Sequence, residues 1–130
     1  MIYIEKRVWN LLKDAPTAST LKIFLYLAIN QPDDGICGFR TTKEQLALDL
    51  NLKKSTIFAA LHWLEKNILV QEIKQVADFD FMVNPYLVMN NGDRDARIAE
   101  WSRRQRIDTL KEVENSRRRQ KKLAKMNNQG

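Results

Sequence analysis

The stretch EQLALDLNLKKSTIFAALHWLEK, residues 44–66, decides the fold. Its apolar residues recur at the three- and four-residue spacing that one face of a helix requires. This pattern predicts two short helices, over about 43–49 and 53–66, with a tight turn between them. Few Gly or Pro residues interrupt the surrounding chain, so neighbouring elements are expected on both sides.

The spacing within this stretch is typical of a helix-turn-helix. Such a unit needs a small residue where its two helices pack, a turn residue four positions later, and a branched apolar residue six positions beyond. Ala47, Asn51 and Ile57 have this spacing. Asn tolerates the left-handed backbone that the turn requires. An ordinary helical hairpin with no nucleic-acid role is the alternative interpretation.

Capping signals place the helix boundaries. Thr41–Glu44 and Thr42–Gln45 both have the spacing of a capping box, which predicts a helix start near residue 42. An earlier helix is expected over about 19–30, capped by Thr17 or Ser19. Asn67 is expected to end the second helix of the pair in a left-handed conformation.

Short β-rich runs flank these helices. They are residues 36–42, 68–75 and 79–89, and the last two are compatible with a hairpin. The order helix, helix, short strand, helix, helix, hairpin is that of a winged helix-turn-helix. We therefore expect a mainly α fold with a small β-hairpin wing (α+β), formed by a domain over residues 1–92 and followed by a long basic helix within 93–130.

The second helix of the pair is the expected recognition helix, whose first turns would enter the major groove of DNA. Its exposed face offers cations and hydroxyls to phosphates and base edges, and the small Ala59 permits close approach. Phe58 is expected to pack under the wing instead. The start of the preceding helix is placed to contact the DNA backbone. The expected DNA-binding residues of this unit are Thr41, Thr42, Lys43, Lys53, Lys54, Ser55, Thr56, Ala59 and His62.

The charge of the chain is concentrated at one end. The net charge is +6, yet residues 1–92 hold ten Lys/Arg and ten Asp/Glu, whereas 93–130 hold twelve and six. Segment 94–126 lacks Gly and Pro and predicts one long helix. Between 116 and 126 it has six Lys/Arg and no acid, a strip that would neutralise phosphates without reading sequence. The expected contacts in this strip are Arg117, Arg118, Arg119, Lys121 and Lys122.

Other interpretations of this helix stay open. Ile107, Leu110 and Val113 recur at threes, but apolar positions do not persist for the three heptads of a coiled coil. Ile98 and Trp101 are expected to dock the start of the helix onto the domain, and a contact with a second subunit, hence a homodimer, is compatible with them. A solvated helix that only keeps the chain soluble is the remaining alternative.

Several function classes are disfavoured. No apolar run reaches the roughly 20 residues of a membrane span, and the first residues lack the apolar core of a secretion signal, so a cytoplasmic protein is expected. A single Cys and a single His exclude an internal disulfide and argue against a metal site. No phosphate loop, carboxylate cluster or nucleophile–base pair is visible, so neither an enzyme nor a cofactor is expected.

The phrase FDFMVNPYLVM, residues 79–89, adds a family resemblance. Together with the order of elements over about 2–92, it resembles the winged-helix replication initiators of small plasmids, of the RepL type. That resemblance implies a protein that binds its plasmid's origin, helps to open it and draws in host replication proteins. It carries over only to residues of the matching helices, which are Thr42, Lys43, Lys53, Lys54, Ser55 and Thr56.

Three functions therefore follow from the sequence. The leading one is sequence-specific binding of double-stranded DNA that initiates replication of a plasmid or similar element. The first alternative is a transcriptional regulator that binds an operator through the same helix. The second alternative is a protein or RNA interaction module that acts through the basic tail.

Overall fold

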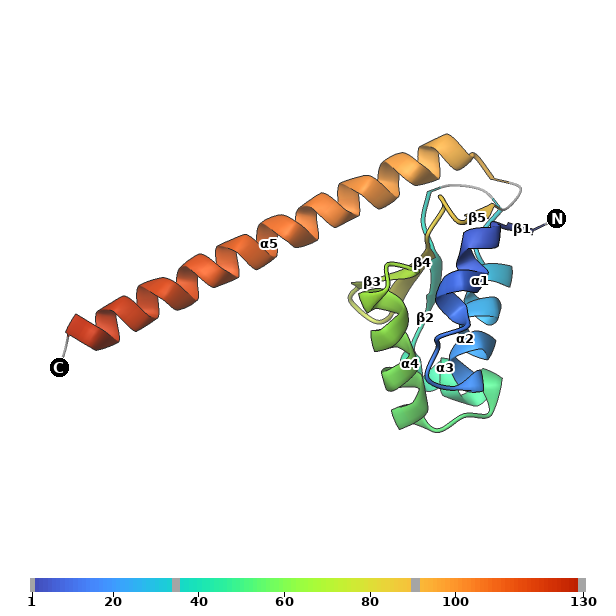
Figure 1. Ribbon diagram of the computed structural model, residues 1–130, viewed down its shortest axis with the longest axis horizontal. Coiled ribbons are helices and arrows are strands. Elements are labelled where there is room, and N and C mark those ends of the chain that lie inside the picture. The colour runs from blue at the N-terminus through green and yellow to red at the C-terminus, as the bar shows by residue number, and fades with distance from the viewer. Residues whose placement is uncertain (1, 34–35, 90–91, 129–130) are drawn as a thin grey trace.

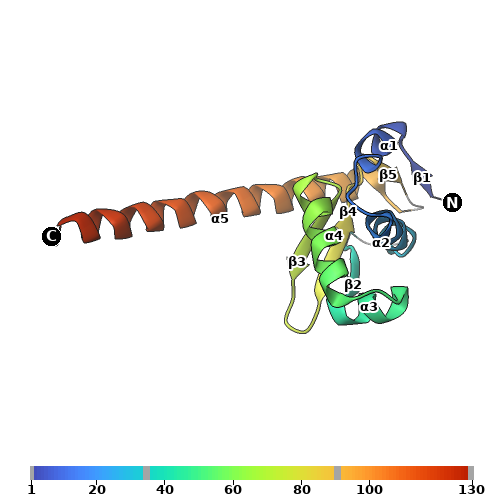
Figure 2. The same ribbon diagram turned by 60° about the horizontal axis from the view of Figure 1, so that its bottom comes forward.

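The computed structural model describes residues 2–33, 36–89 and 92–128, and its last helix projects far from the rest of the chain (Figure 1). The same separation is visible when the molecule is turned (Figure 2). In chain order the elements are β1 (Tyr3–Ile4), α1 (Lys6–Leu12), α2 (Ala18–Ile29), β2 (Phe39–Thr41), α3 (Lys43–Leu50), α4 (Lys54–Lys66), β3 (Val70–Lys74), β4 (Phe79–Val83), β5 (Val88–Met89) and α5 (Arg94–Asn128).

The strand order is that of a winged helix. An antiparallel three-stranded sheet has the order β2-β4-β3, with β3 and β4 forming the hairpin and β2 pairing with β4. The strand β2 lies in the chain between α2 and the helix pair α3–α4, as the winged helix requires. A second, two-stranded sheet joins β1 to β5. The fold is therefore mainly α with a small β-hairpin wing, a winged helix-turn-helix followed by a long basic helix.

The predicted capping residues set the helix starts. The hydroxyl of Thr17 accepts a hydrogen bond from the Thr20 N–H, and that of Thr42 accepts one from the Gln45 N–H at 3.0 Å. These bonds satisfy N–H groups that a helix start leaves without a partner. Asn51 ends α3 with φ 53°, which confirms the left-handed turn expected between the two helices.

The end of α4 differs from the expectation. Asn67 has φ −92°, and the left-handed residue is Ile68, with φ 59°. The Asn67 side chain instead donates to the Trp63 carbonyl at 2.9 Å and covers the last turn of the helix. A branched side chain in this region costs about 1–2 kcal/mol. The Asn84 amide holds the Ile68 carbonyl at 2.9 Å and keeps the chain in this conformation.

The expected strand over 79–89 is divided in two. The backbone carbonyl of Asn84 accepts from the N–H groups of Leu87 and Val88, and its side-chain oxygen accepts from the Tyr86 N–H. These bonds close a turn at Asn84-Pro85, and the proline cannot donate to a strand partner. The chain therefore leaves β4 and pairs with β1 as β5.

The hydrophobic core lies between the helices and one face of the sheet. Leu46 and Ile57, which belong to the helix-turn-helix pair, are fully buried, and Ala47 packs against them from the edge. Hydrogen bonds from α2 fix the end of α3, because Lys22 donates to the Leu50 carbonyl at 2.8 Å. The other buried core residues are Val8, Leu12, Ile23, Phe24, Leu27, Ala28, Leu50, Ala60, Leu61, Leu64, Leu69, Val70, Phe81, Val83, Leu87 and Val88.

The start of α5 covers the opposite face of the sheet. Trp101 is 1% exposed, which confirms its expected docking, and its carbonyl accepts from the Gln71 side chain at 2.9 Å. The Arg104 guanidinium donates to both carboxylate oxygens of Asp80, at 3.0 and 3.2 Å, and to Glu100 at 3.0 Å. Burial on α5 thus extends to Arg104. A domain boundary between residues 92 and 93 stays a prediction.

Glu100 links two arginines on this helix. Its carboxylate accepts from Arg103 and Arg104, and its side chain is 10% exposed. The hydrogen bond from Arg103, with that from Arg104 added, lowers the pKa of Glu100 to about 2. The carboxylate is therefore charged at neutral pH and shares the Arg104 charge with Asp80.

Substituting Arg104 tests this docking. Arg104→Met leaves the buried Asp80 carboxylate without its guanidinium, so the free energy of unfolding should fall by about 3–5 kcal/mol. Urea unfolding measures the change. Arg106→Met, an exposed position on the same helix, is the matched control and should stay within about 0.5 kcal/mol of the parent. Equal stability of the two variants would contradict the proposed role of Arg104.

Candidate nucleic-acid interface

The face of α4 that points away from the core carries most of the expected recognition residues. Ile57, Ala60, Leu61 and Leu64 bury one face of the helix. On the other face Lys53, Lys54, Ser55, Ala59 and His62 are exposed, and Thr56 is half-buried. The helical period places Ser55, Ala59 and His62 on one face, because residues three and four apart lie together, and Lys53, Lys54 and Thr56 surround the first turn beside them.

The amino end of α4 has no side-chain cap. Lys53 occupies the capping position and makes no side-chain hydrogen bond there, whereas Thr17 and Thr42 cap α2 and α3. The first N–H groups of α4 are thus left to solvent among the described residues. Such N–H groups, with the positive end of the helix dipole, favour a negatively charged ligand.

Lys54 is held by an exchangeable partner. Its ammonium lies 2.7 Å from a Glu44 carboxylate oxygen, and the two side chains are 54% and 62% exposed. The hydrogen bond from Lys54 lowers the pKa of Glu44. Exposed pairs of this kind contribute little to stability, so a phosphate can replace the carboxylate at small cost.

Lys43 is occupied inside the domain. Its ammonium lies 2.6 Å from a Glu72 oxygen, and both side chains are only 15% exposed. The same atom lies 4.4 Å from the ring centroid of Phe58 and 4.7 Å from that of Phe79. Lys43 therefore ties α3 to α4 and to the wing. The sequence predicted a contact with a DNA phosphate, but this ammonium is occupied by Glu72. Phe58 packs beside the wing, although its side chain is 44% exposed.

The two threonines before α3 also have structural roles. Thr41 is 8% exposed because it lies in β2 and pairs with Phe79 across the sheet. Its side chain is therefore withdrawn from the DNA contact that the sequence suggested. Thr42 is half-buried and uses its hydroxyl as the cap of α3.

The wing adds a residue that the sequence reasoning missed. Lys74 is exposed at the end of β3, while Arg40 on β2 pairs with Asp78 at 2.8 Å. The tip of the hairpin carries Val76, which is fully exposed. The alternation along β3 was the available signal. Gln71 bonds to α5, so Lys74, three positions later, lies on the opposite face of the strand.

The basic strip lies apart from α4. Arg117, Arg118, Arg119, Lys121 and Lys122 are exposed on the part of α5 that extends beyond the domain (Figure 1). Arg118 pairs with Glu114 at 2.8 Å on the helix surface. A helical rise of about 1.5 Å per residue places Arg119 roughly 22 Å beyond Arg104. The structure therefore does not bring the two groups of cations into one patch.

The described ranges also bear on metal binding and on membrane insertion. Within 2–33, 36–89 and 92–128, no group of three or more His, Cys, Asp or Glu side chains could hold a metal ion. Among the helices of the same ranges, none combines the length and apolar character needed to cross a membrane.

Comparisons with known proteins add similar structures but no family. A comparison with protein-family models found no match, and a comparison with curated proteins found none. The transcriptional regulator HlyU from Vibrio vulnificus CMCP6 is similar with a TM-score of 0.45 and 17% identity, over 78% of this chain and 86% of that one. A transcriptional regulator homologue from Pyrococcus horikoshii OT3 has a TM-score of 0.45 and 16% identity, over 85% of this chain and 96% of that one. These scores carry no functional argument, and the fold assignment rests on the element order described above.

The clamp at Lys43 has a measurable consequence. Lys43→Met keeps the aliphatic stem but leaves Glu72 without its partner and removes the contact with the two rings, so the free energy of unfolding should fall by about 1–3 kcal/mol. Urea unfolding again provides the measurement. The control is Lys53→Met, at an exposed lysine for which the structure shows no ion pair in the described ranges; it should stay within about 0.5 kcal/mol. A Lys43 variant as stable as its control would exclude the clamp.

Proposed function

We propose that this chain binds double-stranded DNA, with the first turns of α4 in the major groove. The observation that carries the proposal is the uncapped amino end of α4, beside which Lys53, Lys54 and Ser55 are exposed. A major groove about 12 Å wide admits one helix, and the small Ala59 allows α4 to approach the base edges. Lys54 and Ser55 then contact bases or phosphates, and the backbone N–H groups bind a phosphate.

In this proposal the basic strip supplies affinity without sequence preference. The domain itself is electrically neutral over 1–92, so it attracts a polyanion only weakly. The strip holds six cations on an exposed helix, and each phosphate that they neutralise releases counterions. The basic strip lies far from α4 (Figure 1). With α5 in this direction, the strip contacts DNA several base pairs away from the recognition helix.

The finer role that we propose is initiation of replication at the origin of a plasmid or similar element, with host replication proteins as partners. Its support is the resemblance of residues 2–92 to RepL-type initiators. An operator-binding transcriptional regulator would use the same face of α4, and a homodimer is compatible with either role.

Two variants separate recognition from general attraction. Lys54→Ala with Ser55→Ala should reduce the preference for the best site over unrelated duplex by about 1–3 kcal/mol. Replacing the six cations of 116–126 by Gln should weaken binding to every sequence and reduce the slope of log K against log salt by up to about 5. Fluorescence anisotropy over a salt series measures both, and Lys66→Ala at the far end of α4 is the control.

The outcome also tests the alternative of a protein or RNA interaction module. The Lys54→Ala, Ser55→Ala variant could keep its full preference for the best site while the Gln variant of 116–126 loses all binding. In that case α4 does not recognise DNA sequence, and the basic strip alone binds the partner. Equal binding of the parent chain to any duplex at physiological salt would reject sequence-specific recognition.

A nuclease footprint over the gene that encodes the chain and its flanking DNA distinguishes the two finer roles. For an initiator we expect several regularly spaced protected copies of one sequence beside an A·T-rich stretch. A single protected palindrome over the promoter would instead assign the regulator.

A further inference from the structure

An arginine near the start of α5 is buried with two of its guanidinium nitrogens unpaired in the described part of the chain. Arg97 is 6% exposed, and its Nε and Nη2 atoms are buried with no hydrogen-bond partner in the described part of the chain. Arg104, two turns later on the same helix, is equally buried at 7% exposed but is paired with Asp80 and Glu100. Arg104 and Arg97 are therefore equally buried on one helix, but carboxylates neutralise only Arg104 among the described residues.

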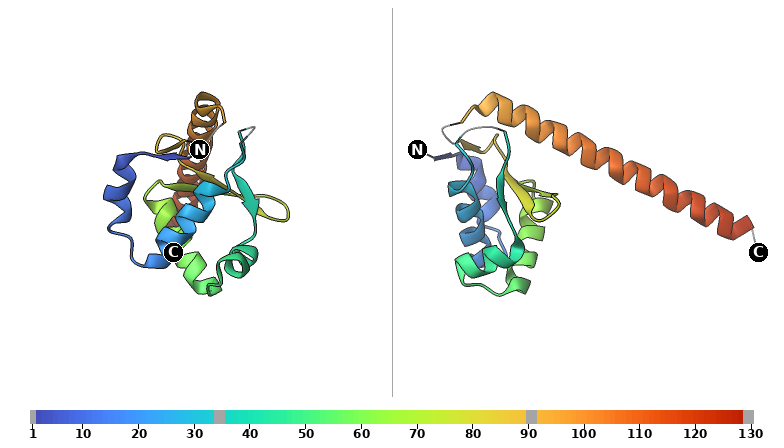
Figure 3. Two further views of the ribbon diagram at one scale, coloured as in Figure 1. Left: turned by 90° about the vertical axis from the view of Figure 1, so that its right-hand side faces the viewer. Right: turned by 180° about the vertical axis from the view of Figure 1, so that it is seen from behind.

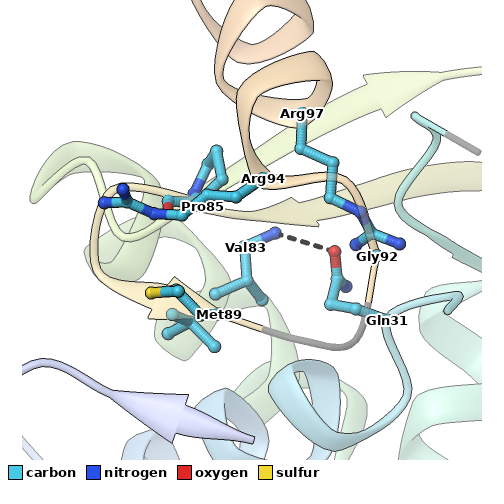
Figure 4. A pocket seen from close by; sticks show the side chains of 8 residues that line it. Gln31, Val83, Pro85, Met89, Gly92, Arg94 and Arg97 are labelled. Carbon is cyan, nitrogen blue, oxygen red and sulfur yellow. Dashed lines mark hydrogen bonds between the residues drawn. The ribbon is translucent and has the colours of Figure 1, made fainter.

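The Arg97 side chain reaches into a small pocket between α5, β4 and β5 (Figure 4). Within the described ranges the lining includes no Asp or Glu. The amide of Gln31 is already used, since it donates to the carbonyls of Leu27 and Phe81 and accepts from the Val83 N–H. The remaining described lining residues are Pro85, Val88, Met89, Gly92 and Arg94.

Gly92 makes room for the guanidinium. A Cβ atom at this position would lie 3.0 Å from Arg97 Nε, 3.1 Å from Nη2 and 2.8 Å from the carbonyl oxygen of Asp33. Because glycine has no Cβ, the backbone can lie directly against the charged group. The pocket is therefore shaped around Arg97, although nothing among its described protein atoms balances the charge.

Positive groups other than Arg97 also lie close to the pocket. Arg94 is in its wall, with its guanidinium directed away from that of Arg97 (Figure 4) toward the carbonyls of Pro85 and Tyr86 at 3.4 and 3.5 Å. The amino end of α5 adds the positive end of its dipole. Asp93 uses a carboxylate oxygen to accept from the Ala96 N–H at 3.2 Å, and Asp33, whose carbonyl oxygen lies against Gly92, is exposed. An arginine stays protonated in proteins, and an isolated charge in such a site is costly.

We propose that this pocket binds a small inorganic anion of the size of chloride, held against the Arg97 guanidinium. The cavity has a volume of about 10 Å³, at the lower end of what one water molecule needs, so the binding of a chloride ion, which is larger than water, moves the walls of the pocket slightly outward. Phosphate, sulfate and larger ligands exceed it. A water molecule would fit but would leave the charge uncompensated.

The start of α5, which carries Arg97, lies at the end of the domain opposite to α3 and the start of α4, as two further views show (Figure 3). The site is therefore independent of the proposed DNA interface. The anion links the first turns of α5 to the β4–β5 corner and so stabilises the base of the helix that carries the basic strip.

The test compares thermal unfolding of the full chain in sodium chloride and in sodium gluconate at equal ionic strength. Gluconate is too large for the pocket, so a saturable rise in Tm of about 5 °C is expected with chloride only. Arg97→Met should abolish this rise, whereas Arg106→Met, at an exposed position on α5, should keep it. Equal Tm values in the two salts, or an unchanged chloride response in Arg97→Met, would overturn the proposal.

A second measurement needs no variant. Crystals of the parent chain grown in sodium bromide should show an anomalous scattering peak beside the Arg97 guanidinium. A pocket without such a peak at saturating bromide would also overturn the proposal, whatever the stability of the variants.

Discussion

The buried carboxylate of Asp80 is the interaction on which the arrangement of the sheet depends. It lies in the central strand β4, where it accepts from the Gly38 N–H before β2 at 2.9 Å and from Arg104 of α5. A side chain at Gly38 would clash with Asp80 and with the Phe81 carbonyl, so this approach of the two strands requires glycine. The Asp80 carboxylate thus binds the residue before the edge strand β2 and also binds α5, which covers one face of the sheet. Because it is only 2% exposed, losing Arg104 leaves its charge without compensation, and losing the Gly38 N–H removes one hydrogen bond from a buried oxygen.

Ion pairs neutralise part of the charge of the domain, and this affects which cations remain for a ligand. Lys43 is bound to Glu72 under the wing, Arg40 to Asp78 at the hairpin, and Arg104 to Asp80. Lys53 is exposed without an ion pair in the described ranges, and Lys54 has only an exposed partner. Within the described part of residues 1–92, ion pairs involve four of the ten Lys/Arg residues, which are Arg7, Arg40, Lys43 and Lys54. In the proposed function, this concentrates electrostatic attraction at the amino end of α4 and on the distal part of α5.

The phrase that carries the family resemblance is a structural corner. Asn84 fixes the left-handed Ile68 carbonyl with its amide, closes the turn to Tyr86 with its side-chain oxygen, and receives two N–H groups on its backbone carbonyl. Asn84 and Pro85 are buried, so this corner presents little to a partner. The phrase is therefore evidence for how β4 connects to β5. It supports the winged-helix part of the resemblance, while replication initiation stays a proposal.

The sequence by itself determined the helix pair, its turn at Asn51, the cap at Thr42, the hairpin and the long helix, because each depends on local periodicity or on hydrogen bonds within a few residues. It also indicated the exposed face of α4, since the buried positions of an amphipathic helix leave the others to solvent. Only the tertiary structure decided that Thr41 is buried, that Lys43 is bound to Glu72, and that Arg97 is buried with two nitrogens unpaired in the described ranges. Those outcomes depend on contacts between residues far apart in the chain, such as Lys43 with Glu72 and Arg104 with Asp80, the latter 24 positions apart. A local pattern cannot specify them, because which charges become partners is fixed only when distant elements pack together.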